Sequence, residues 1–365
     1  MQLSRIISSL ERWAPPVLQE SYDNAGLLTG HPSLECTGIV CTLDVTEKII
    51  AEALSHNCNL IVAHHPFVFT PLKKITGSTA VERTLIQAIK HDIAVYAIHT
   101  NLDNILQGVN GKMADRLGIT QRRVLEPKPN TLRKLYTFVP VAHFESVQAA
   151  LFKAGAGHIG QYSECSFSSE GQGTFKAGSG TTPFVGNVGE RHTENELKLE
   201  VIFPFHLQDA IIRSLKEAHP YEEVAYEVVQ LENTHDATGS GLIGPLEKPM
   251  NEKDFLELVK IQFGAPMVRH TTLRNRPVST VALCGGAGSF LAGKAKAAGA
   301  DVYLSADFKY HEFFAGDENM LVCDIGHFES EQFTMDLLVE QLTGNFPTFA
   351  IRKSGISTNP VKYYF

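Results

Sequence analysis

Residues 59–66 have the sequence NLIVAHHP, in which a short apolar run is followed directly by two histidines and a proline. A short run rich in aliphatic and β-branched residues predicts a buried strand, and proline ends a strand because it has no N–H for the ladder. We therefore expect His64 and His65 to follow the carboxyl end of a strand. A turn there lets both imidazoles face one ion, although a single histidine at such a place is more often a hydrogen-bonded loop residue.

The sequence on both sides of this segment alternates between short apolar runs and helical patterns. Residues 38–43 and 93–98 predict two further strands, and residues 46–56 and 79–91 predict the helices between them. This alternation is typical of a largely parallel sheet covered by helices. In open sheets of this class, ligands bind at the carboxyl ends of the strands.

Length and composition limit the class of protein. The chain has 365 residues, of which 43% are hydrophobic and 20% charged, which is typical of a folded soluble protein with more than one domain. A formal charge of −8 argues against non-specific binding to nucleic acid or anionic lipid. The start of the chain lacks a signal-peptide pattern, and no apolar run reaches the roughly 18 residues of a membrane span. With six cysteines and no C-x-x-C pair, a cytoplasmic, disulfide-free protein is expected.

The sequence predicts an insertion in the α/β pattern. Residues 1–128 carry the first part of an α/β domain and residues 239–365 the second part. Between them, residues 129–238 show the order strand, helix, strand, strand, helix, strand of a ferredoxin-like module. In this module we expect a strand at 161–167, followed by a glycine-rich excursion at 171–189 that either senses a ligand or completes an oligomer contact.

A weak internal repeat relates the two flanking segments. A shift of 243 residues lays Cys41 on Cys284 and His64 on Asp307, with strand, turn, helix and strand in both copies. Because the identities are few, a structural duplication remains one of two alternatives. If the repeat is structural, Asp307 stands at the carboxyl end of a strand, as His64 does.

A second strand end also carries candidate ligands. The predicted strand at 93–98 leads into HTNLD, which places His99 and Asp103 at its exit. Asp103 is either a metal ligand or a turn or capping residue, since aspartate is common in both of the latter roles. His99 is either a partner that orients a metal ligand or a catalytic base.

The third strand end is the most informative. The apolar run at 320–323 leads into DIGHFESE. A helix that begins near Gly326 places His327 and Glu331 at i and i+4, on one face, where such a pair can bind one metal. The alternative is a polar first turn, in which an acidic residue is favoured by the helix dipole.

Together, the three strand ends supply five candidate metal ligands: His64, His65, Asp103, His327 and Glu331. Imidazole and carboxylate groups bind Zn²⁺, Mn²⁺, Fe²⁺ and similar ions. Five ligands are more than one tetrahedral zinc needs, whereas two ions about 3.5–4 Å apart, bridged by a carboxylate, use them all. The sequence therefore predicts two divalent ions per subunit, Zn²⁺ first and Fe, Mn or Mg as alternatives, with Asp103 or Glu331 as the bridge.

Other residues are candidates for contacts with substrate. Asp307 and Lys309 follow the predicted strand at 302–305, and His311 is available as an acid or base near neutral pH. The alternative is a polar strand end with a capped helix. The glycine-rich turn at 284–289 either contacts a phosphate through backbone N–H groups or permits a helix to pack closely on the sheet.

The combination of A-H-H-P, H-T-N-L-D and G-H-F-E-S-E resembles the GTP cyclohydrolase I type 2 homologue family, also called the NIF-three-like family, over essentially the whole chain. The resemblance implies a NIF-three-like fold of mixed and parallel sheets flanked by helices. It also implies that the five candidate ligands hold a metal pair. A tryptophan-Asp-Asn-x-Gly stretch of the family matches residues 22–26, with Tyr22 in place of the tryptophan and Asn24 as a candidate substrate contact.

The resemblance further implies a central domain similar to the P-II and CutA trimeric regulators, and toroidal homohexamers built from trimers. The function that follows is a metal-dependent hydrolase acting on an anionic small molecule, either a nucleotide or a phosphorylated metabolite. No guanine-reading motif supports GTP itself. The alternative is a non-enzymatic metal carrier or insertase, or a regulatory metal-binding oligomer.

Overall fold

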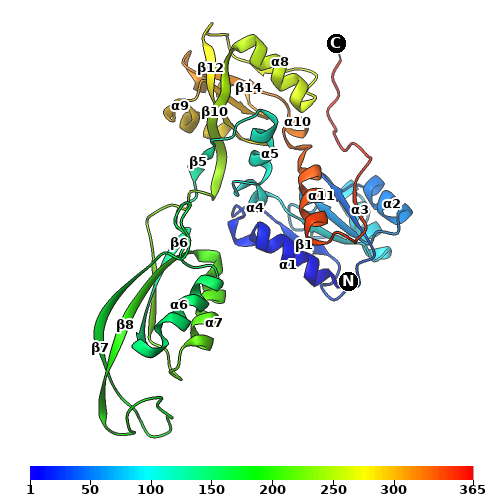
Figure 1. Ribbon diagram of the computed structural model, residues 1–365. Coiled ribbons are helices and arrows are strands. Elements are labelled where there is room, and N and C mark those ends of the chain that lie inside the picture. Colours follow the sequence, from blue (N-terminus) through cyan, green and yellow to red (C-terminus); the bar gives the residue numbers. More distant parts are fainter. Residues whose placement is uncertain (365) are drawn as a thin grey trace. The chain divides into compact units, whose positions relative to one another are not determined.

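The computed structural model describes residues 1–364, which divide into two compact units (Figure 1). The flanking unit consists of Met1–Pro127 and the chain from Ala237 onward, and the inserted unit consists of Lys128–Asp236. Among the described residues, no helix combines the length and apolar composition needed to cross a membrane.

The first sheet of the flanking unit has the strand order β1-β4-β3-β2-β15. Its strands are β1 (Gly26–Thr29), β2 (Ile39–Thr42), β3 (Leu60–Ala63), β4 (Ala94–Ala97) and β15 (Ile351–Lys353). The last four are parallel, and β1 is antiparallel to β4. The three predicted strands are present, and every residue of β2, β3 and β4 is buried, which explains their continuous apolar sequences.

Helices cover both faces of this sheet. Alternate residues such as Cys41, Val62 and Tyr96 pack with helices α1 (Leu3–Trp13) and α11 (Thr334–Asn345). The residues between them, such as Val40 and Ile61, pack with α2 (Glu47–Ser55) and α3 (Ala80–Lys90). The alternation follows from the two-residue period of a strand.

The second sheet has the order β11-β14-β13-β12-β10-β5. Its strands are β5 (Arg123–Pro127), β10 (Gly239–Asn251), β11 (Arg269–His270), β12 (Pro277–Leu283), β13 (Val302–Ser305) and β14 (Leu321–Asp324). Helices α5 (Val109–Arg116) and α8 (Glu252–Phe263) pack on one face, and α9 (Ala292–Ala297) packs on the other. The flanking unit is therefore a mixed α/β fold with both parallel and antiparallel pairs.

The two sheets share one strand arrangement. The order β1-β4-β3-β2 in the first sheet corresponds to β11-β14-β13-β12 in the second, with three parallel strands and one antiparallel edge strand in each. His64 follows β3, and two residues after β13 comes Asp307. The weak repeat thus coincides with a repeat of topology. The neighbours of β2 and β12 differ, because β15 is parallel to β2 and β10 is antiparallel to β12.

The inserted unit is a four-stranded antiparallel sheet of order β7-β8-β6-β9 with two helices. Its elements are β6 (Leu132–Pro140), α6 (Phe144–Lys153), β7 (Ser166–Lys176), β8 (Arg191–Pro204), α7 (Gln208–Ala218) and β9 (Tyr226–Gln230). The helices lie side by side on one face (Figure 1) and cover buried residues such as Leu135 and Leu199.

One predicted strand of the inserted unit was misplaced. The sequence predicted a strand at 161–167 and an excursion from Gly171, whereas β7 begins at Ser166 and continues through the glycines to Lys176. It does so because β7 pairs residue by residue with β8, from Ser166 opposite Val201 to Lys176 opposite Arg191. A long antiparallel partner satisfies the backbone of a glycine-containing strand that local propensity disfavours.

Candidate metal centre

The ends of three strands, two in the first sheet and one in the second, bring the predicted ligands together. His64 and His65 leave β3, and their backbone N–H groups still bond to the chain that leaves β2. Helix α4 (Thr100–Asp103) follows β4 and ends on Asp103. Helix α10 (His327–Glu331) follows β14, after Gly326 turns the chain with a φ of 91°. The predicted start of this helix is confirmed.

Glu331 lies at the centre of the cluster. Its Oε2 atom is 3.0 Å from the Nε2 atoms of both His65 and His327, which are 3.4 Å from each other. Its Oε1 atom faces the Nε2 atom of His64 at 3.8 Å, and that nitrogen is 3.7 Å from Oδ1 of Asp103. The structure therefore places all five predicted residues around one point.

Each of the three imidazoles is oriented by a hydrogen bond from its other nitrogen. The Nδ1 atoms bond to the carbonyl oxygen of Ile98 (His64, 2.9 Å), to the carboxylate of Asp44 (His65, 2.8 Å) and to the carboxylate of Asp307 (His327, 2.7 Å). A carbonyl or carboxylate oxygen accepts, so Nδ1 carries the proton. When a metal replaces the proton on Nε2, that nitrogen would therefore present its lone pair to the ion, as in histidines that bind metals.

Two atoms of the cluster are buried without a hydrogen-bond partner. They are Nε2 of His64 and Oδ1 of Asp103, and the His64 side chain is fully buried. Buried polar atoms nearly always have a partner, because leaving one unpaired costs free energy. A cation between the two atoms would satisfy both, so the residues fit a metal ion.

The cluster also concentrates negative charge in a buried place. Burial raises the pKa of Asp103 to about 7, and the nearby charge of Glu331 adds to this effect. Burial alone would raise the pKa of Glu331, but hydrogen bonds from histidines hold it well below its usual range. Two adjacent carboxyl groups in such a place are both ionised only when positive charge lies beside them; otherwise one of them keeps its proton.

Two of the histidines supply this positive charge when no metal is bound. Burial alone would lower the pKa of His65, but its bonds to Asp44 and Glu331 raise it to about 9. For His327, the bonds to Asp307 and Glu331 outweigh burial in the same way and raise the pKa to about 11. A divalent cation would replace these protons.

His99, which follows β4, adds a fourth imidazole next to His64 and His65. The ring nitrogens of His64, His65 and His99 all lie within 4.8 Å of one another, and those of His65 and His327 lie as close to a Glu331 oxygen. These two groups could each hold a metal ion. His99 is itself held by Asp23, whose Oδ1 atom is 2.7 Å from Nδ1. Hydrogen bonds from His99 and Thr100 outweigh burial and lower the pKa of Asp23 to about 2.

A pocket of about 620 Å³ opens beside the cluster. Its wall includes His65, His99 and His327, so the cluster faces a space large enough for a small molecule. Arg269 lies on the same wall, pairs with Asp324 and has its guanidinium 5.3 Å from the Phe313 ring. The cluster is thus accessible from the pocket.

The remaining predicted residues lie in different places. Asp307 lines the pocket and its carboxylate is bound to His327. Lys309 caps the short 3₁₀ helix Tyr310–Gly316, within which the His311 ring contacts aromatic neighbours. Asn24 is exposed and donates to the carbonyl oxygen of Val68. Lys309, His311 and Asn24 are not among the pocket-lining residues of the described chain.

The glycine-rich turn after β12 has a packing role at the cluster. A Cβ atom on Gly286 would lie 2.3 Å from Oε1 of Glu331, and the residue has a φ of 62°. Its N–H donates to the hydroxyl of Ser330 on α10. Glycine is required here because both the backbone angle and the approach of Glu331 exclude a side chain.

The comparison with known proteins agrees with the motifs. The sequence pattern of the family described as Duf34/NIF3 (NGG1p interacting factor 3) matches residues 1–360. The chain belongs to the Duf34/NIF3 family. The resemblance inferred from the three motifs is thereby confirmed.

Relatives of this Duf34/NIF3 protein match it over most of their length. A Bacillus subtilis protein named GTP cyclohydrolase 1 type 2 homolog is 39% identical over 367 residues, covering 98% of both chains. One from Halalkalibacterium halodurans with the same name is 41% identical over 307 residues, covering 84% of this chain and 82% of the relative. The crystal structure of a Bacillus cereus protein related to NIF3 has a TM-score of 0.88 at 36% identity, covering 100% of this chain and 99% of the other.

Sequence reasoning missed several residues of this Duf34/NIF3 site. Asp44 follows β2 at the same sheet edge as His65, so the strand-exit rule that found the histidines would have found it. Asp23 stands in the quoted N-terminal motif, but nothing local links it to His99. Asn359 and Tyr363 reach the pocket from the end of the chain, where no motif marks them.

The orienting role of Asp44 gives a prediction for this Duf34/NIF3 centre. Changing Asp44 to Asn should lower metal affinity about 10–100-fold, because a neutral amide oxygen polarises His65 less than the carboxylate does. Competition with a coloured chelator measures the affinity. Asp92→Asn is the control, since Asp92 is exposed and its positive φ suits asparagine. Equal affinities in the two variants would contradict the assigned role.

Proposed function

We propose that this protein is a metal-dependent hydrolase with two divalent cations in its centre and a nucleotide or another phosphorylated metabolite as substrate. The pocket of about 620 Å³ beside the cluster carries the hydrolase proposal, because it gives a substrate access to the ligand histidines. Divalent cations held there would lower the pKa of a bound water and polarise a phosphoryl oxygen.

The proposal of two ions rests on the two oxygens of Glu331. Oε2 faces His65 and His327, while Oε1 faces the side holding His64 and Asp103. One ion would take the first set of ligands and the other ion the second. The sequence left Asp103 and Glu331 as candidates for the carboxylate between the two ions, and we propose Glu331. Zn²⁺ is the first candidate because the donors are imidazole and carboxylate, with Fe, Mn and Mg as alternatives.

The chain offers a proton-transfer group on the pocket wall. His99 lines the pocket, and Asp23 holds its Nδ1–H, which leaves the other ring nitrogen to accept a proton. We propose His99 as the residue that moves a proton during hydrolysis. Lys309 and His311 remain candidates only if the 3₁₀ helix that carries them moves toward the pocket.

For the substrate we propose a class of compounds and not a single molecule. Relatives carry the name GTP cyclohydrolase 1 type 2 homolog, so GTP is the first compound to test. The pocket wall includes Phe69 and Tyr363, whose rings suit a flat base, and the divalent cations would attract the anionic group of such a substrate.

A substrate screen tests the proposed hydrolase. Metal-loaded protein should turn over at least one nucleotide or phosphoester, and His99→Gln should lower that turnover about 10²–10⁴-fold with metal content unchanged. His311→Gln is the control and should keep its activity. If His99→Gln binds less metal than the wild type, His99 is a metal ligand and not the proton-transfer residue. A loaded protein that turns over nothing but donates its ions to an apo-acceptor is a carrier, and the hydrolase proposal then fails.

We also propose that the inserted unit is a ferredoxin-like domain of the P-II and CutA kind. Its element order and the sheet order β7-β8-β6-β9 support this proposal. The homohexamer built from trimers is a proposal that rests on the family resemblance alone. A cytoplasmic location is supported by the six cysteines, which are all free thiols.

A further inference from the structure

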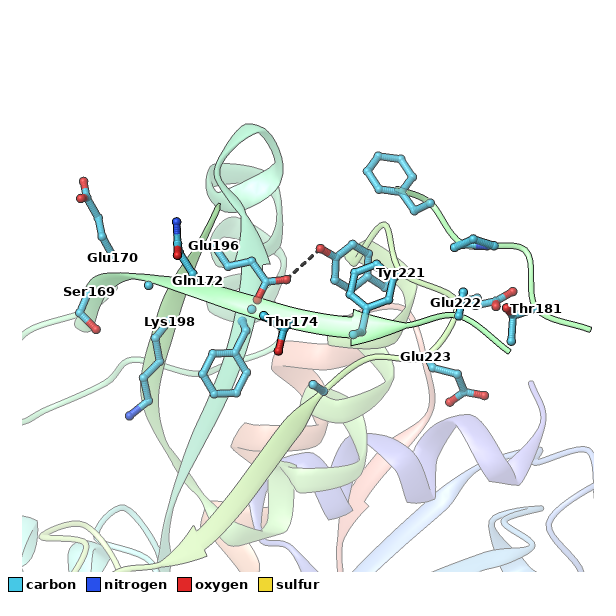
Figure 2. Close-up of a pocket in the computed structure, with 18 residues that line it drawn as sticks. Ser169, Glu170, Gln172, Thr174, Thr181, Glu196, Lys198, Tyr221, Glu222 and Glu223 are labelled. Atoms are coloured by element: carbon cyan, nitrogen blue, oxygen red, sulfur yellow. Dashed lines mark hydrogen bonds between the residues drawn. The ribbon is translucent and has the colours of Figure 1, made fainter. Parts of the chain in front are cut away.

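A second pocket, of about 590 Å³, lies within the inserted unit (Figure 2). It lies on the sheet face opposite the helices: Phe138 and Lys198 line the pocket, whereas Val139 and Leu199, one residue further on, are buried beneath α6 and α7. Its volume falls within the roughly 300–1,000 Å³ of small-molecule sites. None of the groups at the metal centre takes part in it.

Aromatic side chains form one wall of this pocket. The ring of Tyr221 is 6.1 Å from that of Phe175 and 6.2 Å from that of Phe184, measured between centroids. Phe184 comes from the loop after β7 and is half exposed. The three rings offer apolar and π-electron surface to a bound molecule.

The charged groups of the pocket are mostly acidic. Four glutamates line it (Glu170, Glu196, Glu222 and Glu223), against a single base. That base, Lys198, is already engaged, because its Nζ atom is 2.8 Å from Glu200 and 4.3 Å from the centre of the Tyr136 ring. The lining is therefore complementary to a positively charged ligand.

Glu196 is the most buried of these carboxylates, with 8% of its surface exposed. The hydroxyl of Tyr221 donates to its Oε1 atom at 2.8 Å (Figure 2). Its Oε2 atom lies so close to Gly173 that a Cβ atom there would be 2.1 Å away, so glycine makes room for it. A buried carboxylate with one neutral donor lacks the counter-charge that such groups normally have.

The arrangement of the carboxylates argues against a metal ion. Figure 2 shows Glu170, Glu196 and Glu223 spread along the pocket instead of converging. In residues 1–364, the groups of three ligands close enough for one ion are those of the centre described above. Glu222 is used differently, since its carboxylate accepts the N–H of Thr182 and fixes the loop that carries Phe184. Separated negative charges with aromatic surface between them suit an extended organic cation.

We propose that this pocket binds an aliphatic polyamine. One ammonium group bonds to Glu196 and another to Glu223 at the exposed rim. The methylene segments between the ammonium groups pack on the rings of Phe175 and Tyr221, which also attract the charges through cation–π interactions. The inserted unit thus recognises a ligand independently of the metal-dependent reaction.

Titration calorimetry of the full chain with spermidine tests this proposal. We expect saturable binding of one spermidine per chain. Glu196→Gln should weaken binding about tenfold or more, because it removes a charge-assisted hydrogen bond from a buried place. Glu223→Gln, at the exposed rim, should weaken it several-fold without any risk to folding. Glu217→Gln on α7 makes the same change in charge outside the pocket and should leave the affinity unchanged.

Three outcomes would overturn the proposal. The first is the absence of saturable spermidine binding by the wild-type chain. The second is an equal loss of affinity in Glu217→Gln and Glu223→Gln, which would show attraction to net charge only. The third is displacement of spermidine by Mg²⁺ beyond the effect of NaCl at equal ionic strength, which would make the pocket a metal site.

Discussion

Glu331→Gln is expected to lower the affinity of the centre for divalent metal more than about a hundredfold, since loss of a mere orienting partner already costs about 10–100-fold. The substitution keeps the shape of the side chain but removes the charge that lies 3.0 Å from both His65 and His327. It also removes the carboxylate that faces His64. Chelator competition, together with elemental analysis of the purified protein, measures the loss.

Glu329→Gln is the matched control for this variant. Glu329 lies on the same helix and is also buried, but its carboxylate accepts a hydrogen bond from Asn359 instead of facing the histidines. It should therefore keep the metal content of the wild type. A Glu331→Gln protein that binds as much metal as the control would show that Glu331 is not a ligand.

Metal affinity is expected to rise about a hundredfold per pH unit around pH 8, because binding displaces two protons there and Asp103, with a pKa of about 7, is already ionised. In the metal-free chain the pKa of His65 is about 9 and that of His327 about 11, so both rings are protonated at neutral pH. Two protons leave when a metal binds. Toward pH 10 the dependence should fall to about tenfold per unit, because His65 is then mostly neutral while His327 is still protonated. Chelator competition across this range measures the slope.

The same titrations affect the stability of the metal-free protein. A histidine whose folded-state pKa is raised stabilises the fold fully below its unfolded pKa, and the contribution disappears as the pH rises through the folded value. The melting temperature of the metal-free chain should therefore fall between about pH 6.5 and pH 9, with a further loss toward pH 11. The metal-loaded chain should not show this fall. A pH-independent affinity and stability would show that His65 and His327 are neutral in the metal-free state.

The sequence could predict part of the cluster because the relevant rule is local. A strand ends where its apolar run ends, and parallel strands of one sheet end at one edge, so His64, His65 and Asp103 could be placed together before any contact was known. The joining of His327 and Glu331 to this edge requires the second sheet to pack against the first. The prediction grouped all five residues because each follows a strand end, the family resemblance agreed with that grouping, and the structure gives its geometry.

The residues around the ligands were harder to predict because their contacts span the chain. The C-terminal residue Asn359 meets Glu329, and Arg269 pairs with Asp324 from the edge strand β11. No periodicity of the sequence encodes either contact. The 243-residue repeat did place Asp307 beside the site, but it carried no information on the 3₁₀ helix that takes His311 out of the pocket wall.

The residues that line the pocket of the inserted unit could not be predicted from the sequence, for a similar reason. The sequence left the glycine-rich stretch at 171–189 undecided between a ligand loop and an oligomer contact. Which of its side chains face the pocket depends on the register of β7 against β8, which sets Gly171 opposite Glu196 and Phe175 opposite His192. Register is a property of strand pairing and is not contained in either strand alone.

Anomalous diffraction from crystals of the metal-loaded protein, recorded on both sides of the absorption edge of the bound element, tests the central claim most directly. Our account predicts two peaks per chain, one beside His65 and His327 and one beside His64 and Asp103, with the carboxylate of Glu331 between them. A single peak that Glu331 does not contact, or no peak at these histidines in a protein that holds stoichiometric metal, would contradict it.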